Sequence, residues 1–551
     1  MTQFRINSAL ALLLLLAFVA CAHAADIALT GRVSSSAEGA MEGVLVSAHA
    51  AGSPITVTVV SDAQGRYAFP AARLPAGTYA LAIRAVGYAL DGAPVATVAA
   101  GQTATADLTL RPAADLAAQL TSTEWLISMP GTAEDKRPLI ECMSCHTLER
   151  VVRSTFSADQ FMDVLRRMQG YANNTTVQKP QRRVAERELS EKRAHALAGY
   201  LATVNLSKSE TDPPTWSYPL KTLPRPTGRA TRVIITEYAL PRATIAPHDV
   251  RPDAQGFVWY SNFVEPYLGR LDPRTGAHAE FRYELPKPAF PAGALALEPD
   301  QDGNWWLALM FQSGLMRFDP RSEKFEDFPI PPALMTDATQ QSLLMPGEAR
   351  VDGKVWTNDV STHDILRLDL ATGRYEAIDP FGGMPKGRQH SPYGMAADAA
   401  NNLYFMDFGD ESIGRVDAKT LRTTLYPTPT QGSRPRRGMM DAQARLWFAE
   451  FAANKVAMFD TKKETFREWD VPTPHTYPYD VFFDRQGELW SGSMSSDRVL
   501  RLDPVSGAAV EYLLPDPTNI RRIFIDDRTT PPTFWTGNNH HAAIVKLEPL
   551  D

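Results

Sequence analysis

The sequence has very little cysteine: its 551 residues contain three, which are Cys21, Cys142 and Cys145. A zinc site would need a second pair of ligands that this count does not supply. The chain also lacks an excess of positive charge, since its formal net charge is −7, and this argues against a nucleic-acid partner. Beyond the first 20 residues no stretch is long and apolar enough to cross a membrane. We therefore expect a soluble protein with about three or four domains.

The first 24 residues have the three parts of a secretory signal peptide. Arg5 precedes an apolar run over residues 9–20, and residues 22–24 form an A-x-A cleavage site. Cleavage after Ala24 removes Cys21 and leaves no membrane span, so we expect the mature chain in the bacterial periplasm or outside the cell. The alternative is a lipoprotein anchored through Cys21, because residues 18–21 loosely resemble a lipoprotein cleavage box.

Both remaining thiols lie in the run Cys142-Met143-Ser144-Cys145-His146, and C-x-x-C-H in an exported protein is the attachment signature of a c-type haem. The two thiols add to the two vinyl groups of one porphyrin, and His146 becomes the proximal ligand of the iron. A redox-active cysteine pair, half of a zinc site and a surface disulfide are the alternatives. A redox pair does not require His146, and the zinc site lacks its other ligands. We expect one covalent haem c.

The surrounding residues 113–208 have a helical pattern. Ser157 and Gln160 form a capping box, and a second helix is expected behind Ser190. Residues 197–202 resemble the last helix of class I cytochromes c, which implies a small all-α cytochrome c domain and an electron-transfer role. Behind the first capping box, apolar residues recur at the spacing of one helix face; they are Phe161, Val164, Leu165 and Met168.

Met168 is the candidate for the distal ligand of the haem iron, because it lies on this apolar stripe shortly before Gly170 and Tyr171. The alternative is an ordinary core methionine, which the stripe does not exclude. Met162 lies about 100° away from the centre of the stripe. Ligation by histidine and methionine would raise the reduction potential and suit electron transfer.

Residues 25–112 alternate apolar and polar side chains in short runs separated by turn residues, which is typical of a small all-β sandwich. The order of turns and aromatic residues, as in Gly77-Thr78-Tyr79 and Gly87-Tyr88, resembles the carboxypeptidase regulatory-like family. The resemblance implies a transthyretin-like β-sandwich without catalytic residues. Its expected role is accessory, in folding, docking or carbohydrate contact.

A proline-rich linker over residues 209–230 leads into residues 231–551, which are periodic. Seven units of about 40 to 55 residues predict a C-terminal seven-bladed β-propeller. Residues 231–238 precede the first unit and are expected to supply the outer strand of the last blade. Six units begin with a proline, at Pro247, Pro291, Pro346, Pro392, Pro435 and Pro478. Each unit then has an aromatic residue, at Trp259, Trp306, Trp356, Tyr404, Trp447, Trp490 and Trp535, and an acid thirteen residues later, at Asp272, Asp319, Asp369, Asp417, Asp460, Asp503 and Glu548.

The aromatic and acidic repeats are expected to be structural, whereas function in a propeller belongs to positions that break the repeat at the central mouth. One set of such positions follows the proline and another lies three residues after the aromatic. Together they predict a polar pocket, and the alternative is a set of solvated loop tips. The candidate mouth residues are His248, Asn262, Asp359, Tyr393, Asp407, Arg434, Arg436, Glu450 and Tyr479.

The units resemble the streptogramin (virginiamycin B) lyase-like propellers, as in Pro392-Tyr393-Gly394 and Trp447-Phe448-Ala449-Glu450. That family opens a macrocyclic ester by elimination, with a histidine base and Mg²⁺ held by glutamates. Glu450 matches a metal-binding glutamate, but Arg434 and Arg436 stand where a glutamate and the catalytic histidine are expected. Arginine neither holds Mg²⁺ nor acts as a base near neutral pH. The resemblance therefore supports the fold, and the catalytic residues stay unassigned.

Taken together, we expect a multidomain, mainly β protein with three domains, at residues 25–112, 113–208 and 231–551. The leading functional hypothesis is electron transfer by an exported haem protein, with a periplasmic electron donor or acceptor as partner. The propeller would then bind a substrate or partner. The first alternative is a lyase acting on a cyclic or ester substrate. The second is a non-catalytic propeller that binds a small molecule or a glycan.

Overall fold

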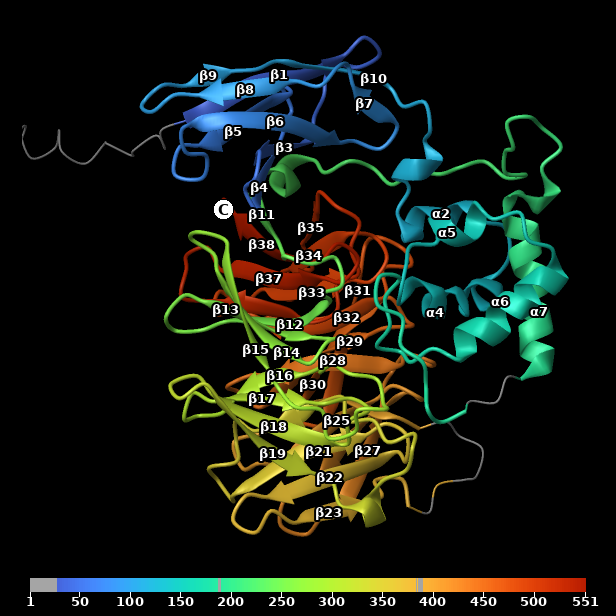
Figure 1. The fold of residues 1–551 in the computed structure, drawn as a ribbon, viewed down its shortest axis with the longest axis vertical. Helices are drawn as coiled ribbons and strands as arrows, with labels where there is room; N and C mark the ends of the chain where they lie inside the picture. The colour runs from blue at the N-terminus through green and yellow to red at the C-terminus, as the bar shows by residue number, and fades with distance from the viewer. Residues whose placement is uncertain (1–26, 187–189, 383, 385–389) are drawn as a thin grey trace, which may run out of the picture.

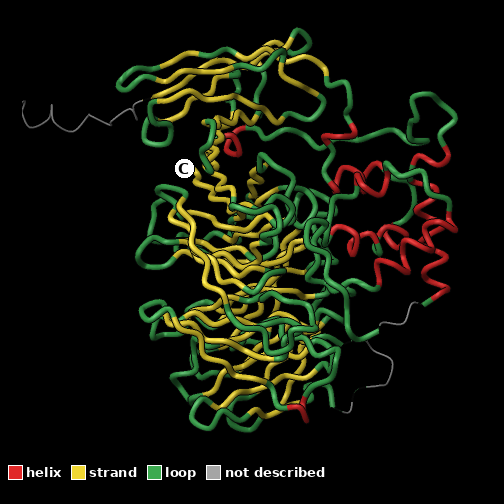
Figure 2. Tube along the Cα trace, viewed as in Figure 1, coloured by secondary structure: helices red, strands yellow, loops and turns green. Residues whose placement is uncertain are grey.

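The structure is a computed structural model that describes residues 27–186, 190–382, 384 and 390–551. The predicted signal peptide, residues 1–24, lies outside the described residues, and so does Cys21. Figure 1 shows a small β region at the top, a large region of strands below it and a group of helices at one side. Strands make up most of the molecule, and the longer helices are confined to that group (Figure 2).

The N-terminal region is a β-sandwich, as the alternating pattern predicted. Strand β1 is the centre of one sheet, where it pairs with β2, β5, β9 and β10, and β7 pairs with β10. The other sheet has the order β4-β3-β6-β8. Leu29, Val33, Val46 and Phe69 are buried between the sheets. The strands are β1 (Ile27–Ser35), β2 (Gly39–Ala40), β3 (Leu45–Ala50), β4 (Ile55–Val60), β5 (Arg66–Pro70), β6 (Gly77–Arg84), β7 (Tyr88–Leu90), β8 (Val95–Val98), β9 (Ala104–Thr105) and β10 (Leu108–Pro112).

The C-terminal region is a β-propeller of seven four-stranded sheets. The first strands of neighbouring blades contact one another, so they lie innermost. The first three blades are β12 (Pro247–Pro252), β13 (Val258–Asn262), β14 (Tyr267–Asp272) and β15 (Ala277–Arg282); β16 (Leu297–Pro299), β17 (Trp305–Ala308), β18 (Gly314–Asp319) and β19 (Lys324–Pro329); and β20 (Leu344–Met345), β21 (Lys354–Asp359), β22 (Asp364–Asp369) and β23 (Tyr375–Ile378).

The next three blades are β24 (Pro392–Ala397), β25 (Leu403–Asp407), β26 (Ser412–Val416) and β27 (Thr423–Pro427); β28 (Pro435–Met440), β29 (Arg445–Glu450), β30 (Lys455–Asp460) and β31 (Thr465–Asp470); and β32 (Pro478–Phe483), β33 (Leu489–Ser493), β34 (Arg498–Leu502) and β35 (Ala509–Leu513). The last blade is formed by β36 (Ile523–Asp526), β37 (Thr533–Asn538), β38 (Ala543–Pro549) and β11 (Val233–Ala239). Strand β11 pairs with β38, which confirms the predicted closure of the ring.

The sandwich and the last blade share one sheet, which the sequence did not predict. Strand β4 pairs antiparallel with β11, from Ile55 opposite Tyr238 to Val59 opposite Ile234. Eight strands therefore run continuously in the order β36-β37-β38-β11-β4-β3-β6-β8. Backbone hydrogen bonds hold the N-terminal region on the propeller.

The aromatic and acidic repeats are structural, as expected. The Trp259, Trp306, Trp447 and Trp490 indoles each donate a hydrogen bond to an aspartate six residues earlier. The repeated acids accept hydrogen bonds from backbone N–H groups of the turns that follow, for example Asp272 from Arg274. These contacts fix the hairpins of each blade and leave the repeats no part in a site.

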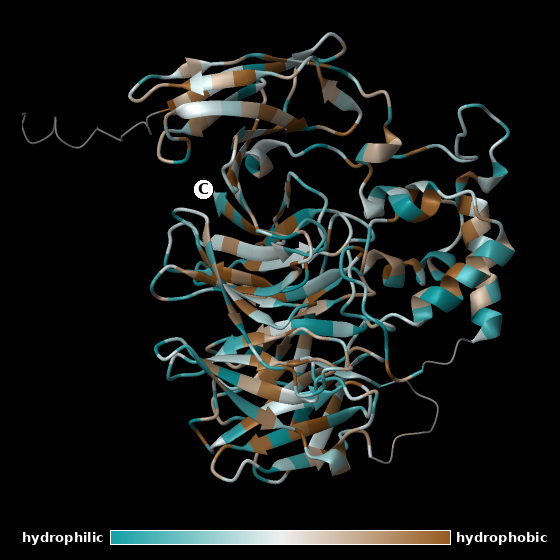
Figure 3. Ribbon diagram, in the orientation of Figure 1, coloured by the Kyte–Doolittle hydropathy of each residue, from teal (hydrophilic) through white to brown (hydrophobic). Residues whose placement is uncertain are grey.

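The helices lie between the sandwich and the propeller in sequence and against one side of the propeller in space (Figure 1). Ser157 and Gln160 form the expected capping box of α6. Figure 3 shows hydrophobic and hydrophilic residues alternating along α6 and α7. The helices are η1 (Ala117–Gln119), α2 (Ser122–Ser128), α3 (Ala133–Lys136), α4 (Leu139–Met143), α5 (Glu149–Val152), α6 (Ala158–Gln169), α7 (Glu191–Val204) and η2 (Leu206–Lys208), and two further short turns are η3 (Gly228–Thr231) and η4 (Pro332–Leu334).

The helices do not form a distinct all-α domain with a core of its own. Their buried residues, among them Trp125, Met143 and Leu201, belong to the same hydrophobic cluster as Tyr393 and Tyr479 of the propeller. The helices pack on one another, chiefly α6 on α7, and their buried residues join the hydrophobic cluster of the propeller. No helix within the described ranges is long and apolar enough to cross a membrane.

Candidate functional site at the propeller mouth

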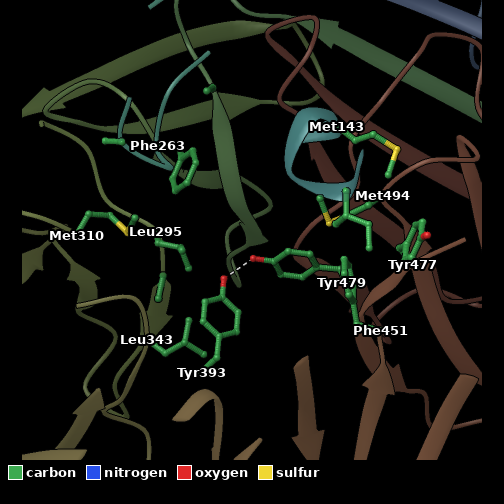
Figure 4. Close-up of a cluster of buried hydrophobic side chains, with 14 of the residues drawn as sticks. Met143, Phe263, Leu295, Met310, Leu343, Tyr393, Phe451, Tyr477, Tyr479 and Met494 are labelled. Atoms are coloured by element: carbon green, nitrogen blue, oxygen red, sulfur yellow. Dashed lines mark hydrogen bonds between the residues drawn. The ribbon is translucent and has the colours of Figure 1, made fainter. Parts of the chain in front are cut away.

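Four candidate residues converge where the innermost strands begin. His248, Tyr393, Arg436 and Tyr479 each follow the proline that opens β12, β24, β28 or β32. A proline restricts the entry of each strand in the same way, so the next side chain leaves each blade in the same direction. The innermost strands β24 and β28 also lie very close together, which brings Tyr393 and Arg436 near each other. A Cβ on Gly394 would lie only 2.0 Å from the backbone oxygen of Arg436. Figure 4 shows Tyr393 and Tyr479 pointing toward each other, with Met143 of α4 close to the opening.

The Arg436 guanidinium is enclosed by aromatic rings. Its central carbon lies 3.9 Å from the ring centre of Tyr479, 4.3 Å from Phe451, 4.4 Å from Phe408 and 5.4 Å from Tyr393. Among the described residues its nearest polar contact is the sulfur of Met494, at 3.7 Å, and its buried Nε has no partner. Rings bind a cation through their faces, yet they leave its N–H groups without acceptors. This guanidinium is therefore available to an anion.

A second guanidinium, that of Arg521, joins the mouth to the helices. It donates to the Ser144 carbonyl at 2.7 Å and to the Asn519 side chain at 2.9 Å. Asn519 donates to the Met143 carbonyl at 2.8 Å. Burial lowers the pKa of Arg521, which makes contact with no carboxylate within the described part of the chain. The residues of the C-x-x-C-H run thus lie over the mouth and are held there by the last blade.

Tyr479 lies between these cations. Its hydroxyl contacts the hydroxyl of Tyr393. Burial by itself raises the pKa of Tyr479, but the charges of Arg436, Arg521 and Arg437 outweigh burial and lower the pKa below its usual value. Burial and the neighbouring Tyr479 raise the pKa of Tyr393. The pair therefore has one acidified phenol with a neutral phenol beside it as a hydrogen-bond donor.

His248 also has a polar partner on one side only. Its Nδ1 lies 2.8 Å from Asp249 Oδ1, while its buried Nε2 has no partner among the described residues. Burial lowers the pKa of His248 to about 3, so the imidazole is neutral and Nε2 accepts hydrogen bonds. The ring lies 4.7 Å from Phe263 and 6.2 Å from Tyr479, measured between ring centres. His248 is thus placed to accept a hydrogen bond at the mouth.

Beneath the mouth, charged residues of the innermost strands form a belt of ion pairs. Arg437 binds both carboxylate oxygens of Asp249, at 3.1 and 3.0 Å. Arg522 lies 3.2 Å from Asp480 and 2.7 Å from Glu298, and Glu298 also pairs with Arg251. The pKa of Asp249 is lowered, since Arg437 and His248 outweigh its burial. This belt connects blades 1, 2, 5, 6 and 7 and holds the mouth residues in place.

The C-x-x-C-H residues keep free the side-chain groups that haem attachment uses. Both thiols are free, and burial raises the pKa of Cys142 to about 12. His146 Nδ1 lies 2.8 Å from the Thr147 carbonyl, an arrangement that fixes the ring and leaves Nε2 for a metal. His540 lies close to this run, where it interacts with the Met143 backbone and with His146, and burial lowers its pKa to about 3. These residues fit a haem, and a covalent haem at this position stays a prediction.

Met168 does not lie on the buried face of its helix, so the predicted apolar stripe is wrong at this position, and ligation of a haem iron by Met168 stays a prediction. Met168 is 40% exposed, whereas Phe161 and Met162 are 3% exposed. The other three residues of the predicted stripe do face the core, since Phe161 is buried and Val164 and Leu165 pack against it, and the helix packs on α7. The structure supplies no reason to place the Met168 sulfur at the iron.

The candidates that lie three residues after the aromatic do not line the mouth. Asn262 accepts a hydrogen bond from the backbone N–H of Val264, and Asp359 and Asp407 likewise accept from loop N–H groups. Each stands at the end of its strand, where a polar side chain closes the following loop. Asp407 also contacts His390 at 2.5 Å. The expected single polar pocket is thus replaced by one set of mouth residues and one set of structural residues.

Glu450 and Arg434 stand at two positions where the sequence resemblance implies metal-binding glutamates. Burial and the neighbouring Glu468 raise the pKa of Glu450 to about 8, so this carboxyl is protonated at neutral pH. The Arg434 guanidinium stacks 4.2 Å from the ring centre of Phe408, and its Nε donates to the Phe408 carbonyl. A protonated carboxyl at one of these positions and a guanidinium at the other do not suit Mg²⁺, which prefers charged oxygen ligands.

Several residues of the site were missed or left uncertain in the sequence. Arg521 holds the position in the seventh unit that matches His248 in the first, but it is hard to identify from sequence because that unit lacks the proline. Two of the rings around Arg436, those of Phe408 and Phe451, share a sequence signal: each directly follows the residue three positions beyond a repeated aromatic. Phe263, which contacts Arg521, occupies the same position in the first unit. Asp249, Arg437 and Asn519 have no sequence signal, since their roles depend on partners in distant blades.

Two family models match parts of the chain. Residues 282–544 match the virginiamycin B lyase family, and residues 28–111 match the carboxypeptidase regulatory-like domain. No curated protein matches. Neither matched segment includes residues 113–208, where we expected a cytochrome c domain. The main functional prediction, electron transfer by an exported c-type cytochrome, is therefore wrong, and the alternatives of a lyase-like or a ligand-binding propeller fit better.

Solved structures with similar folds include lyases and one protein of another kind. A streptogramin B lyase is 21% identical, with 59% of this chain and 100% of that chain covered and a TM-score of 0.49. A virginiamycin B lyase from Staphylococcus aureus is 20% identical, with 57% and 99% covered and a TM-score of 0.49; an inactive variant of it was solved with quinupristin. YCF48 from Cyanidioschyzon merolae is 12% identical, with 57% and 99% covered and a TM-score of 0.46.

Proposed function

We propose that this protein is a ligand-binding propeller of the virginiamycin B lyase type whose mouth binds a small molecule with a carboxylate or similar anionic group. One observation carries the proposal. The Arg436 guanidinium is held among four aromatic rings without a carboxylate partner in the described residues. The Arg436 side chain is partly buried with its Nε enclosed, so a guanidinium without an anion is costly there, and a bound anion would reduce that cost.

The charges around the mouth support an anion rather than a cation. Arg521 lies close enough to Arg436 for their charges to interact, and it contacts only a carbonyl and an amide. Glu450 is protonated at neutral pH, and Asp249 is occupied by Arg437. The surrounding aromatic rings favour a ligand with an apolar or aromatic body beside its charge.

Two sources of the anion are consistent with this chemistry. One is a free small molecule. The other is the pair of propionate carboxylates of the haem predicted on Cys142 and Cys145, since Arg521 lies close enough to Cys145 to affect its pKa. The shared chemistry is a carboxylate on two arginines, and the experiment below separates the sources.

The test is isothermal titration of the full chain with benzoate and, separately, with inorganic phosphate. We expect Arg436→Met and Arg521→Met each to weaken benzoate binding at least tenfold, because a charge-assisted hydrogen bond contributes about 1.5–3 kcal/mol. Arg445→Met is the matched control, since Arg445 also stacks on a ring but is paired with Asp441. Equal benzoate affinity in the wild type and both mouth variants would overturn the proposal.

The second arm uses Cys142→Ala/Cys145→Ala and the intact mass of the exported chain. If the wild type carries the mass of one haem and binds benzoate only after both cysteines are replaced, the natural anion is the attached group. If the mass is that of the bare chain and benzoate binds to the wild type, the anion is a free molecule. If benzoate and phosphate bind neither chain and the mass is bare, the proposal fails.

A second candidate is elimination without a metal, favoured by the lowered pKa of Tyr479. The Tyr479 phenolate would take a proton from the carbon next to a carboxyl group, and the electron pair would form a C=C bond as the C–O bond breaks. The leaving oxygen would take its proton from Tyr393. Incubation with quinupristin tests this candidate: turnover that is lost in Tyr479→Phe supports it, and the absence of turnover in the wild type removes that substrate class.

A further inference from the structure

A cavity of about 280 Å³ lies where the sandwich meets the last blade, away from the mouth. One water molecule occupies about 30 Å³, and pockets for small organic ligands begin near 300 Å³. The floor is the continuous sheet, and Pro515 and Asp516 of the loop after β35 form the opposite wall. The lining residues are Ser47, His49, Thr56, Ala80, Leu81, Ala82, Ile83, Arg84, Glu237, Pro515 and Asp516.

The floor of the cavity is polar because strand pairing aligns hydroxyl and ring groups. Glu237 of β11 stands opposite Thr56 of β4, and Thr56 stands opposite His49 of β3. His49 Nδ1 lies 3.1 Å from Thr56 Oγ1. In the next row Ser47 Oγ lies 2.8 Å from Thr58 Oγ1. Side chains of residues opposite one another lie on the same face of a sheet, so these groups form one surface.

Glu237 is the polar group in this cavity that the fold leaves without a partner. It is 7% exposed, and no hydrogen bond to its carboxyl group is made by any residue in the described ranges. Burial and the nearby Asp516 raise its pKa to about 8, while Arg84 lowers it by less. Arg84 is itself held by Asp497 at 2.6 Å and by the Leu514 carbonyl. At neutral pH Glu237 is therefore a protonated acid that is free to donate.

The groups in the cavity suit a neutral hydroxylated molecule. A protonated carboxyl group, two hydroxyls and an imidazole supply both donors and acceptors within one small volume. An anion would meet the Asp516 carboxylate, which is paired with His541 at 3.8 Å. A cation would require Glu237 to lose a proton that its surroundings retain. We propose that this cavity binds a small neutral polyhydroxylated molecule of about the size of a monosaccharide.

The test is saturation-transfer NMR of the full chain with D-glucose, D-galactose and N-acetyl-D-glucosamine. We expect at least one sugar to bind, and its affinity to fall at least fivefold in Glu237→Met and in Thr56→Val. Glu237→Gln keeps the donor and should bind as the wild type does. Arg436→Met is the control for position: it should leave sugar binding unchanged even if it abolishes anion binding at the mouth.

The pH dependence gives a second measure that a structural role for Glu237 would not produce. Below about pH 8 the carboxyl group donates, and above that pH it loses the proton. Wild-type affinity should therefore fall as pH rises from 7 to 9, whereas Glu237→Gln should show no change. Asp516, Arg84, His49 and His541 face the same cavity, so the comparison of these two chains isolates Glu237. Absence of binding by all three sugars, or unchanged binding in both Glu237→Met and Thr56→Val, would overturn the proposal.

Discussion

The ion-pair belt and the mouth both lie between the innermost strands of the propeller, yet their charges are arranged in opposite ways. In the belt, Asp249, Asp480 and Glu298 match Arg251, Arg437 and Arg522 one for one. At the mouth, Arg434, Arg436 and Arg521 meet aromatic rings, carbonyls and amides, and no ion pair to them is formed within the described chain.

Two adjacent residues of β28 make the contrast sharpest. Arg437 is 1% exposed and binds Asp249 through two nitrogens, whereas Arg436 has four rings around it and no acid. Successive side chains of a strand point to opposite faces, so one strand supplies both layers. The belt, whose positive and negative charges are paired, is expected to stabilise the fold. The mouth, whose arginines lack acidic partners, is expected to bind an anion.

The largest expected effect is in the belt. Arg437→Met leaves Asp249 buried without its partner, and breaking a buried pair costs about 3–5 kcal/mol. We expect the free energy of unfolding, measured with a chemical denaturant, to fall by that amount. Arg437→Met/Asp249→Asn should recover most of the loss, because the uncompensated charge is gone. A loss below about 1 kcal/mol in the single variant would contradict the structural role of the belt.

Glu450 provides an intermediate effect that depends on pH. Its folded pKa of about 8 lies above the unfolded value, so the folded state holds a proton that the unfolded state releases. The stability that this proton contributes is complete below about pH 4.5 and is lost as pH rises to about 8. Glu450→Gln should therefore gain about 4 kcal/mol over the wild type between pH 5 and pH 9. Parallel stability curves for the two chains would contradict the assigned pKa.

The tyrosine pair gives a smaller effect. Tyr393→Phe removes the hydroxyl that contacts Tyr479, so the pKa of Tyr479 should rise by less than about one unit, or about 1.4 kcal/mol. The measurement is ultraviolet titration of tyrosinate, with Tyr479→Phe subtracted to isolate this residue. An unchanged titration would show that the arginines alone acidify Tyr479.

The smallest expected change in stability is at Arg436. Arg436→Met should alter the free energy of unfolding by less than about 1 kcal/mol, because the lost ring contacts are offset by the removal of an unbalanced buried charge. The same denaturant titration as for Arg437→Met is the measurement. Equal losses in the two variants would remove the distinction between belt and mouth.

Much of the fold follows from local sequence. The prolines, aromatic residues and acids recur because every blade repeats the same hairpins, and the capping box of α6 is local as well. The ring closure by β11 could be predicted because the last unit lacks its outer strand. The pairing of β11 with β4 could not, since two regular strands leave no sign in the sequence of which edges meet.

The site was predictable only in part. His248, Tyr393, Arg436 and Tyr479 share a position in the repeat, so their convergence could be inferred. Met168 was expected on the buried face of its helix but is exposed. The orientation of a helix depends on the elements it packs against, and the spacing of its apolar residues does not fix which end of the apolar stripe is covered. The spacing of the C-x-x-C-H run predicts a covalent haem. That motif alone was not enough to predict the function of the whole chain.

The sequence by itself determined the order of the regions, the number of blades and the residues at each mouth position, because these depend on periodicity and short-range turn chemistry. Tertiary structure alone decided which arginines are neutralised, which carboxyl groups keep their protons and where Glu237 lies. Those properties depend on distances between residues far apart in the chain and on the exclusion of water, and neither is encoded in local spacing.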